Sequence, residues 1–486
     1  SMKLNSLLQP IESDLLTDDI PDISINGVHF HSKKIQQNFV FVAISGNEAD
    51  GHEYIEDAIK AGAVAILGEK DIKELSVPYI RVKNSRNLLP KLAQRFFDTG
   101  TKKHTIIGIT GTNGKTTTSY MLRHILESAG MRCSLIGTVN NIINGEMLPP
   151  SNTTPDPITL HELMYKSMDE VFIIEVSSHG IDQGRVNGIP FDYVLFTNLS
   201  HDHLDYHGTI YNYFEVKAQL FEQLNHEGEA IVSNYCDWSR RLIDRLNTAQ
   251  KNVFSVGHEE SDHMNLHNVN VEFSTEFNLK QAEQELRVTL PLSGIHNAQN
   301  ASLSFFTARR LGIPAHQAVQ ALNAFPGVPG RFETYTHPSG ATCVIDYAHT
   351  PDGLNHCLQT INKQGAKRVF HIFGFRGNGD PSKRKEMIEI SSKFSNHYIL
   401  TLDDLNGMNA KEMVEELHRL QELYGSEQGT VIEDRTVAIQ MILQQAQEGD
   451  WVIITGKGPE SYKQAFQYPT STDRDTVLYN MATYGA

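Results

Sequence analysis

Short apolar runs alternate with amphipathic stretches along the chain. The first two apolar runs cover residues 39–43 and 63–67, and residues 54–60 between them carry apolar positions at helical spacing. Short apolar runs separated by a helical pattern are typical of strands in an α/β domain. The pattern therefore predicts a small α/β domain over residues 1–103.

A second series of strands and helices begins at residue 105. The apolar run 105–110 leads into a glycine-rich turn and then into a helix predicted over 116–129. Two more apolar runs, 171–176 and 193–198, end in polar clusters, and open parallel sheets place their binding sites at the carboxyl ends of strands. We expect a central nucleotide-binding domain with a mostly parallel sheet over residues 104–330.

A third series fills the C-terminal part of the chain. Its apolar runs cover residues 343–345, 369–373, 398–402 and 451–455, with helical patterns between them. This alternation predicts a Rossmann-like α/β domain over residues 331–486. The whole chain is therefore expected to be an α/β protein of three domains.

The composition argues against several classes of protein. The chain has 486 residues, 40% of them hydrophobic, and a formal net charge of -16. A nucleic-acid-binding protein normally presents a basic face, so this acidity argues against a nucleic-acid partner. The four cysteines show neither a CxxC pair nor zinc-ligand spacing, and no run approaches the roughly 18 apolar residues of a membrane span. We expect a cytoplasmic protein with reduced thiols and no membrane span, and a monomer by default.

Residues 110–117, with the sequence TGTNGKTT, lie between a predicted strand and a predicted helix. Backbone N–H groups and the positive end of a helix bind phosphate at such a turn. Lys115 would reach the outer phosphates of a nucleotide, and Thr116 would ligate Mg²⁺. The strict pattern would place a glycine where Ile109 stands, so the segment is a variant phosphate loop. A glycine turn before an ordinary helix is the alternative.

Acidic and histidine side chains gather after the next two predicted strands. Glu175 ends an apolar run, and residues 198–207 (NLSHDHLDYH) follow another. A buried carboxylate and imidazoles at strand ends suggest ligands of a second divalent cation, because an unpaired buried charge is costly. Any one of these histidines taken alone is more typical of a structural role. Lys217, in a helical pattern, would ordinarily be a solvated lysine.

Eight short motifs follow one another along almost the whole chain: TGTNGKTTT (110–118), NTTPD (152–156), EVSSHGIDQGR (175–185), NLSHDHLDYHG (198–208), KAQLF (217–221), GIHNAQNA (294–301), PGRFE (329–333) and DYAHTPDG (346–353). Together they resemble the Mur ligases, and within that family the MurE type. The resemblance implies an N-terminal domain that binds a UDP-sugar, a central P-loop-type ATPase domain, and a C-terminal domain that closes over an incoming amino acid.

Matching motif positions imply roles for individual residues. ATP would be bound by Gly111, Thr112, Asn113, Gly114, Lys115, Thr116, Thr117, Asn297, Arg331 and Asp346. The UDP-muramoyl peptide would be bound by Ser32, Asn152, Thr153, Thr154, Ser178, Gln183 and Arg185. The catalytic set would be Lys115, Glu175, His203 and Lys217, and Mg²⁺ would be held by Thr116, Glu175, His203 and Lys217. The resemblance also implies that Lys217 is carbamylated, which would turn an ammonium into a carboxylate-like metal ligand.

The C-terminal motif that reads DNPR in diaminopimelate-adding members is Asp403-Asp404-Leu405-Asn406 here. Asn406 occupies the position of the arginine that would bind the distal carboxylate of diaminopimelate. A neutral amide is a poor substitute for the charged, paired N–H donors of a guanidinium. The acidic pair would suit a distal ammonium, which favours L-lysine or another diamino acid over meso-diaminopimelate. Alternatively, the two acids cap a helix that begins near Asn409.

At other positions that match the amino-acid and uridine sites, this chain has some of the family's usual residues and lacks others. Arg384 has the position that would hold the α-carboxylate of the amino acid, and Gly456 and Glu460 are available to contact the same substrate. Gly379 replaces a usual arginine in the loop before Arg384. In the N-terminal domain Ser32 matches the uridine site, although both of its neighbours differ from the usual triplet.

The implied reaction begins with attack of the D-glutamate side-chain carboxylate of UDP-MurNAc-L-Ala-D-Glu on the γ-phosphate of ATP. The amine of an L-amino acid would then attack the acyl phosphate, giving the tripeptide precursor of peptidoglycan, ADP and phosphate. The expected partners are these small molecules, with ATP and Mg²⁺ as cofactors. The alternatives are a divergent paralogue or another amide ligase of the superfamily acting on a different carrier or amino acid, and a non-catalytic nucleotide-binding protein.

Overall fold

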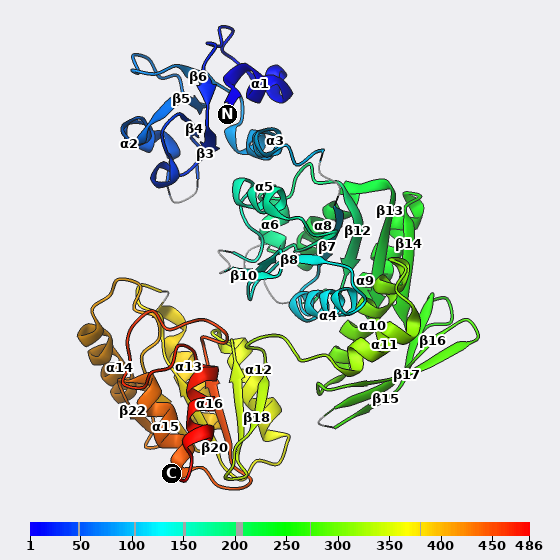
Figure 1. Cartoon of the computed structure of the whole chain (residues 1–486), viewed down its shortest axis with the longest axis vertical. Coiled ribbons are helices and arrows are strands. Elements are labelled where there is room, and N and C mark those ends of the chain that lie inside the picture. Colours follow the sequence, from blue (N-terminus) through cyan, green and yellow to red (C-terminus); the bar gives the residue numbers. More distant parts are fainter. Residues whose placement is uncertain (47–48, 102–103, 149–151, 201–207, 273, 380) are drawn as a thin grey trace. The chain divides into compact units, whose positions relative to one another are not determined.

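The computed structural model describes residues 1–486 except 47–48, 102–103, 149–151, 201–207, 273 and 380. The chain divides into two compact units, Ser1–Phe325 and Pro326–Ala486. The first unit contains two main sheets and the second contains one (Figure 1). The domain limits expected after residues 103 and 330 remain predictions.

The N-terminal sheet has four strands in the order β3-β4-β5-β6, all parallel. Its strands are β3 (Gly27–His29), β4 (Phe39–Val42), β5 (Ala63–Gly68) and β6 (Tyr79–Arg81), and a small ladder joins β1 (Met2–Lys3) to β2 (Ser24–Ile25). The helices are α1 (Leu4–Leu8), α2 (Ile55–Ala61) and α3 (Ser85–Phe97), with short 3₁₀ turns η1 (Gln9–Asp14), η2 (Ser32–Lys34) and η3 (Gly51–Tyr54).

The central sheet has eleven strands, in the order β10-β9-β8-β11-β7-β12-β13-β14-β15-β16-β17. Strands β8 to β15 in this order are parallel, whereas the pairs at both edges are antiparallel. The strands are β7 (Thr105–Thr110), β8 (Cys133–Ile136), β9 (Asn141–Ile143), β10 (Glu146–Leu148), β11 (Val171–Glu175), β12 (Phe191–Phe196), β13 (Leu224–Asn234), β14 (Asn252–Gly257), β15 (Met264–Val271), β16 (Thr275–Gln281) and β17 (Gln284–Leu290).

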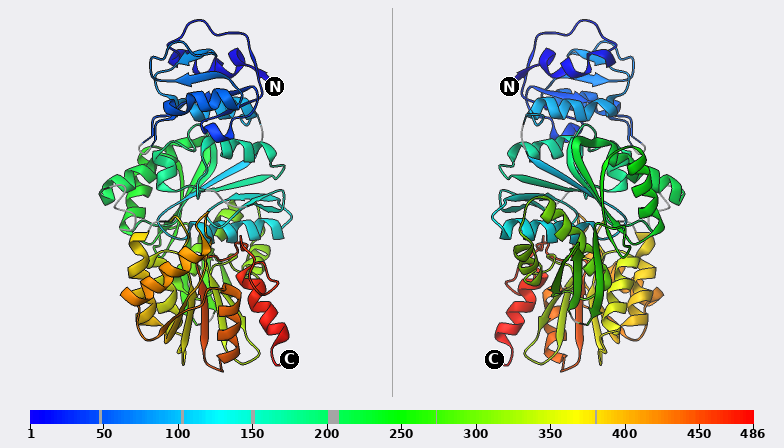
Figure 2. Two further views of the ribbon diagram at one scale, coloured as in Figure 1. Left: turned by 90° about the vertical axis from the view of Figure 1, so that its left-hand side faces the viewer. Right: turned by 90° about the vertical axis from the view of Figure 1, so that its right-hand side faces the viewer.

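Helices cover both faces of the central sheet (Figure 2). One face packs Ile106, Phe172 and Ile174 against α5 (Pro157–Lys166), α6 (Ser178–Asp182), α8 (Ile210–Gln219) and α9 (Asp237–Thr248). The 3₁₀ turn η4 (Leu220–Gln223) follows α8; the remaining helices are α4 (Lys115–Ser128), α10 (Ile295–Arg310) and α11 (Ala315–Asn323). Since β7 and β11 are buried on both faces, their interior positions are apolar or glycine and do not alternate with polar residues.

The C-terminal sheet has six strands in the order β18-β19-β23-β20-β21-β22, antiparallel only between β18 and β19. They are β18 (Glu333–Thr336), β19 (Thr342–Asp346), β20 (Val369–Phe373), β21 (His397–Leu400), β22 (Gly429–Val431) and β23 (Trp451–Thr455). One face packs on α12 (Pro351–Asn362), α13 (Arg384–Phe394) and α14 (Ala410–Tyr424), the other on α15 (Arg435–Gln445) and α16 (Asp473–Thr483). The turn η5 (Pro381–Lys383) precedes α13.

The predicted α/β class with mostly parallel sheets is confirmed. Two predicted strands are displaced: residues 398–402 were expected where β21 covers His397–Leu400, and residues 193–198 were expected where β12 covers Phe191–Phe196. Strand β12 ends early because Asn198 bonds to the glycine-rich turn instead of to a neighbouring strand. Within the described part of the chain, no helix is long and apolar enough to cross a membrane.

Candidate active site

The glycine-rich turn between β7 and α4 has a backbone that requires its glycines. Gly111 and Gly114 have φ angles of 143° and 89°, a region that side chains with a Cβ rarely adopt. A Cβ at Gly111 would also collide with the hydroxyl of Thr197, and one at Gly114 with the amide of Asn300. The turn therefore keeps its N–H groups close to any phosphate at the start of α4.

Asn198, at the end of β12, holds this turn in shape. Its side-chain Oδ1 accepts from the Asn113 N–H at 3.0 Å, and its Nδ2 donates to the Asn113 carbonyl at 3.0 Å. Its backbone carbonyl accepts from the Thr112 N–H at 2.9 Å. Asn198 had no predicted role, although its place after an apolar run was a usable signal.

Two predicted ATP residues point to different sides of the turn. Lys115 Nζ donates to the carbonyls of Gly111 at 2.7 Å and Thr112 at 3.3 Å. Thr116 Oγ1 donates to Glu175 Oε1 at 2.7 Å. Glu175 ends β11 and is fully buried. A hydroxyl and a buried carboxylate side by side form a donor set that suits a hard divalent cation.

Lys217 reaches the same turn from α8. It is 1% exposed, and its Nζ donates to the Gly111 carbonyl at 2.9 Å and lies 4.8 Å from the centre of the Tyr213 ring. Burial, and next the charge of Lys115, hold the pKa of Lys217 well below its usual range. The expectation of a solvated helix lysine is therefore wrong.

The predicted metal set is only partly described. His203 lies outside the described residues. Within the described ranges, no three His, Cys, Asp or Glu side chains gather closely enough to hold a metal ion. Thr116, Glu175 and Lys217 all lie around the turn between β7 and α4, and the role of each stays a prediction.

Five residues predicted to bind the UDP-muramoyl peptide gather at the carboxyl end of β11. Thr154 Oγ1 donates to the Glu175 carbonyl at 2.9 Å. Arg185 donates to the Thr154 carbonyl at 2.8 Å and to Gln183 Oε1 at 2.7 Å. Thr153 shares a 3.0 Å hydroxyl contact with Thr138, and Ser178 begins α6. Thr154 therefore contacts the backbone of Glu175, and Arg185 and Gln183 are linked to Thr154; Asn152, also predicted, is exposed.

Ser32 lies in the N-terminal sheet region, in the 3₁₀ turn η2. It lines a cavity of about 460 Å³ together with Lys33, Tyr54 and Arg86. An aromatic ring beside two cations can accommodate a flat base and a charged phosphate.

Asn297 is in the first turn of α10, where its Nδ2 donates to the Ser293 carbonyl at 2.9 Å. The same helix packs along α4, because Ser304 donates to the Thr118 carbonyl at 2.9 Å. Asn297 is therefore on the helix that also carries Asn300 to the glycine-rich turn.

Asp346 and Arg331 are neighbours in the C-terminal unit. Asp346 ends β19, and its carboxylate accepts from the N–H groups of Phe332 at 2.8 Å and Ala348 at 2.7 Å. Burial raises the pKa of Asp346. The Arg331 guanidinium lies 5.7 Å from the Tyr347 ring, and its buried Nε has no hydrogen-bond partner among the described residues.

The predicted ammonium-binding pair, Asp403 and Asp404, already has a partner within the chain. Lys457 is 1% exposed, and its Nζ lies 2.6 Å from Asp404 Oδ1 and 3.7 Å from Asp403 Oδ1. The capping alternative is wrong, because Asn409 itself caps α14 through its side-chain oxygen. Asn406 adopts a φ of 49° and donates to the Gly377 carbonyl at 3.0 Å.

The remaining predicted amino-acid residues surround Arg376, which the sequence analysis missed. Arg376 Nη2 donates to Glu460 Oε1 at 2.7 Å and to the Gly456 carbonyl at 3.5 Å. Arg384 Nη2 donates to the Arg376 carbonyl at 3.1 Å. The available signal was the position of this arginine, three residues after the apolar strand β20.

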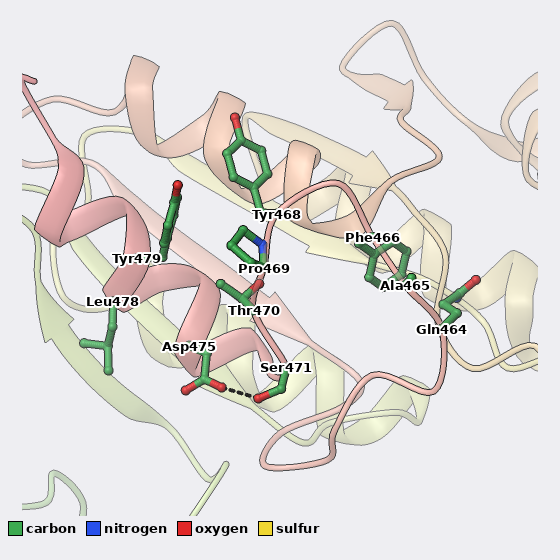
Figure 3. A pocket seen from close by; sticks show the side chains of 10 residues that line it. All are labelled: Gln464, Ala465, Phe466, Tyr468, Pro469, Thr470, Ser471, Asp475, Leu478 and Tyr479. Atoms are coloured by element: carbon green, nitrogen blue, oxygen red, sulfur yellow. Dashed lines mark hydrogen bonds between the residues drawn. The ribbon is translucent and has the colours of Figure 1, made fainter.

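A separate cavity of about 700 Å³ lies beside α16 in the C-terminal unit (Figure 3). Its lining includes Tyr468 and Tyr479, whose rings meet edge to face, and Ser471, which bonds to Asp475. None of the predicted site residues is among the ten described residues that line it.

Family models match three segments of the chain: the Mur ligase family catalytic domain at residues 24–97, the Mur ligase middle domain at 109–308, and the Mur ligase glutamate ligase domain at 330–458. These segments correspond to the three main sheets in their order along the sequence.

Whole-length relatives agree with these matches. Proteins of Caldanaerobacter subterraneus and Listeria monocytogenes, both named UDP-N-acetylmuramoyl-L-alanyl-D-glutamate--2,6-diaminopimelate ligase, are each 34% identical, with 95% of both chains covered. A solved structure of a ligase with that name is 26% identical, with a TM-score of 0.66 and 99% of both chains covered. The chain therefore belongs to the Mur ligase family of ATP-dependent, amide-bond-forming enzymes.

Proposed function

We propose that this chain is the ligase that adds the third amino acid to UDP-MurNAc-L-Ala-D-Glu, with ATP as the energy source. The observation that carries the proposal is the convergence of Lys115, Thr116, Glu175 and Lys217 around one glycine-rich turn. The names of the 34% identical relatives support the choice of the UDP-muramoyl dipeptide as the acceptor.

In this proposal each domain binds one of the three substrates. Residues 1–103 bind the UDP-sugar, with Ser32 in the cavity that Lys33 and Arg86 also line. Residues 104–330 bind the triphosphate of ATP, and residues 331–486 bind the amino acid. Asn297 and Asp346 contact the base and ribose, and Arg331 contacts a phosphate through its planar guanidinium.

Mg²⁺ would be held by Thr116, Glu175, His203 and a carbamylated Lys217. When bound, it would neutralise charge on the γ-phosphate during phosphoryl transfer. The buried carboxylate of Glu175 supports this role, because it lies 2.7 Å from the Thr116 hydroxyl and carboxylate oxygens are ligands that Mg²⁺ prefers.

The surroundings of Lys217, which is buried against the glycine-rich turn, support its carbamylation. Burial and next the charge of Lys115 lower the pKa of Lys217, which favours the neutral amine, and the lone pair of a neutral amine can attack CO₂. The nitrogen forms a bond to carbon and loses a proton, which leaves an anionic carbamate. This anion would remove the repulsion between Lys217 and Lys115 and supply oxygen ligands for the cation.

The chain's own residues then act on the two chemical steps. Lys115 binds the outer phosphates and stabilises the charge that develops when the D-glutamate carboxylate attacks the γ-phosphate. Arg185 and its neighbours at the end of β11 hold the acceptor so that this carboxylate adjoins Glu175. The amine of the amino acid attacks the acyl phosphate, and phosphate leaves.

The amino acid in this proposal is L-lysine or another diamino acid in preference to meso-diaminopimelate. The preference rests on Asn406, whose neutral amide offers no fork for a distal carboxylate. Asp403 and Asp404 support binding of a distal ammonium less strongly than the sequence suggested, because Asp404 is already paired with Lys457. The relatives named as 2,6-diaminopimelate ligases make meso-diaminopimelate the competing substrate.

The test is phosphate release from ATP and Mg²⁺ with UDP-MurNAc-L-Ala-D-Glu and a panel of amino acids, with mass spectrometry of the products. A tripeptide formed fastest with L-lysine or ornithine supports the whole proposal. Fastest reaction with meso-diaminopimelate retains the ligase but refutes the argument from Asn406. Turnover only with a folate or another carrier, or no substrate-stimulated hydrolysis at all, would favour the alternative ligases or a non-catalytic protein.

A further inference from the structure

Arg376 connects three residues predicted to bind the amino acid. Its guanidinium forms an ion pair with Glu460 at 2.7 Å and lies 3.5 Å from the Gly456 carbonyl. Its own carbonyl accepts from Arg384 at 3.1 Å. The side chain is therefore at the centre of the predicted amino-acid site, at the carboxyl end of β20.

The guanidinium of Arg376 is only partly engaged. Its hydrogen bonds to Tyr347, Gly456 and Glu460 all use Nη2. Within the described residues, Nη1 donates to no side chain or carbonyl, and the buried Nε has no partner. With 33% of the side chain exposed, Nη1 can reach a ligand, and the guanidinium has donors left for a carboxylate.

Arg384, which the resemblance assigns to the α-carboxylate, is less available. Its Nη1 lies 3.8 Å from Glu416 Oε1, its Nη2 donates to the Arg376 carbonyl, and its side chain is 10% exposed. The guanidinium also lies 5.6 Å from the centre of the Phe375 ring. Arg384 is thus packed against the segment that carries Arg376.

The ordinary interpretation of Arg376 is a structural salt bridge with Glu460. A structural salt bridge explains the position of Nη2 but not those of the other two guanidinium nitrogens. Among the residues that the structure describes, it leaves a buried Nε–H without an acceptor and Nη1 unused, an arrangement that proteins usually avoid unless a ligand or water completes it. Neither Gly379 nor Asn406 supplies a cation to this site, and among the described residues Lys457 is already paired with Asp404.

We propose that Arg376 binds the α-carboxylate of the incoming amino acid and that Arg384 is a positioning residue that fixes the Arg376 segment. This inference rests on the proposed function and extends it to a residue that the sequence motifs did not assign. Arg376 keeps its bond to Glu460 while its free N–H groups receive the carboxylate oxygens.

The first variant to measure is Arg376→Gln, which removes the charge but retains a polar side chain. The KM for the best amino acid of the panel should rise by on the order of 10- to 100-fold, the loss expected for a charge-assisted hydrogen bond. The KM values for ATP and for UDP-MurNAc-L-Ala-D-Glu should stay within about twofold, because the inference gives Arg376 no contact with either.

The same amino acid with its α-carboxylate replaced by a carboxamide separates binding from structure. The wild-type protein should discriminate strongly against the amide, whereas Arg376→Gln should react with acid and amide at similar KM values. A variant that only lost its salt bridge would weaken both substrates equally. Arg368→Gln is the matched control: Arg368 also forms an ion pair, with Asp450, and lies over a ring, but it precedes β20 instead of following it.

Fluorescence of buried Trp451 checks that each variant is folded. If Arg376→Gln does not fold, Arg376→Lys replaces it; this variant keeps the charge but loses the planar fork, and a several-fold rise in amino-acid KM with reduced acid-over-amide discrimination is expected. Unchanged discrimination in the folded variant overturns the inference and leaves the proposed function standing. Absence of any amino-acid-dependent turnover in the wild-type protein overturns the proposed function and this inference with it.

Discussion

Arg435 and Asp473 form a fully buried ion pair beneath the predicted amino-acid site, and removing one partner should strongly destabilise the C-terminal unit. Both side chains are 0% exposed, and they are joined by bonds of 2.8 Å and 2.9 Å. Arg435 also donates to the carbonyls of Leu402 at 3.3 Å and Thr455 at 3.0 Å, just after β21 and at the end of β23. It therefore holds together the two strand ends that lead to Asp403 and Gly456.

The loss in free energy of unfolding expected for Arg435→Met follows from the buried charge of Asp473, which remains in the variant. Asp473 would keep a buried charge without its cation, with Tyr462 as a remaining donor at 2.8 Å. Breaking one side of a buried pair costs about 3–5 kcal/mol, a range that includes the groups left unsatisfied. Replacing both partners with apolar residues removes the orphaned charge, so Arg435→Met with Asp473→Leu should cost less than either single change.

Urea unfolding followed by tryptophan fluorescence can measure this in the whole protein. The chain has two tryptophans; Trp238 lies in the first compact unit and Trp451 in the second. A Trp238→Phe background leaves Trp451 to report on the C-terminal unit. Arg419→Met, at an exposed ion pair with Glu416, is the control and should change little.

Two outcomes would refute the reasoning about the buried pair. One is a loss below about 1 kcal/mol for Arg435→Met, which would mean that the interior around Asp473 tolerates an unpaired charge. The other is a double variant whose cost equals the sum of the single costs, because independent residues add whereas coupled ones do not.

Three further predictions concern the chemistry, the substrate and pH. Lys217→Met should lower kcat by about 10²- to 10³-fold, and CO₂-free buffer should slow the wild-type protein in phosphate-release assays until bicarbonate is restored; insensitivity to CO₂ would contradict carbamylation. Asn406→Arg should raise kcat/KM for meso-diaminopimelate relative to L-lysine by about tenfold, and an unchanged ratio would show that this position does not select the substrate. Burial lowers the pKa of His161 to about 4, so the unfolded chain binds more protons between that value and 6.5. The contribution of His161 to stability should be constant above about pH 7 and fall by about 2 kcal/mol from pH 7 to pH 5. In urea titrations His161→Gln should show a fall smaller by that contribution, and an equal fall would assign the effect to other groups such as His371, whose pKa is also lowered by burial.

Much of the fold could be predicted from local pattern. Strands β7, β20 and β23 begin and end where their apolar runs do, because a parallel strand buried on both faces is mostly apolar. The predicted strand at 193–198 was displaced because Asn198 bonds to the glycine-rich turn, a partner that periodicity does not reveal. The same contrast holds for the candidate site. The turn at 110–117 is a contiguous motif and could be recognised, whereas Arg376 could not, because its partners Tyr347 and Glu460 are distant in the sequence.

The sequence by itself determined the α/β class, the order of the three sheets and the glycine-rich turn, since short contiguous segments encode each of them. Only the tertiary structure decided that Lys217 is buried against Gly111, 106 residues away, and that Asp404 is paired with Lys457, 53 residues away. The physical reason is that burial and charge pairing depend on which distant segments the folded sheets bring together. A lysine in a helical pattern therefore has the same local sequence whether it is solvated or enclosed.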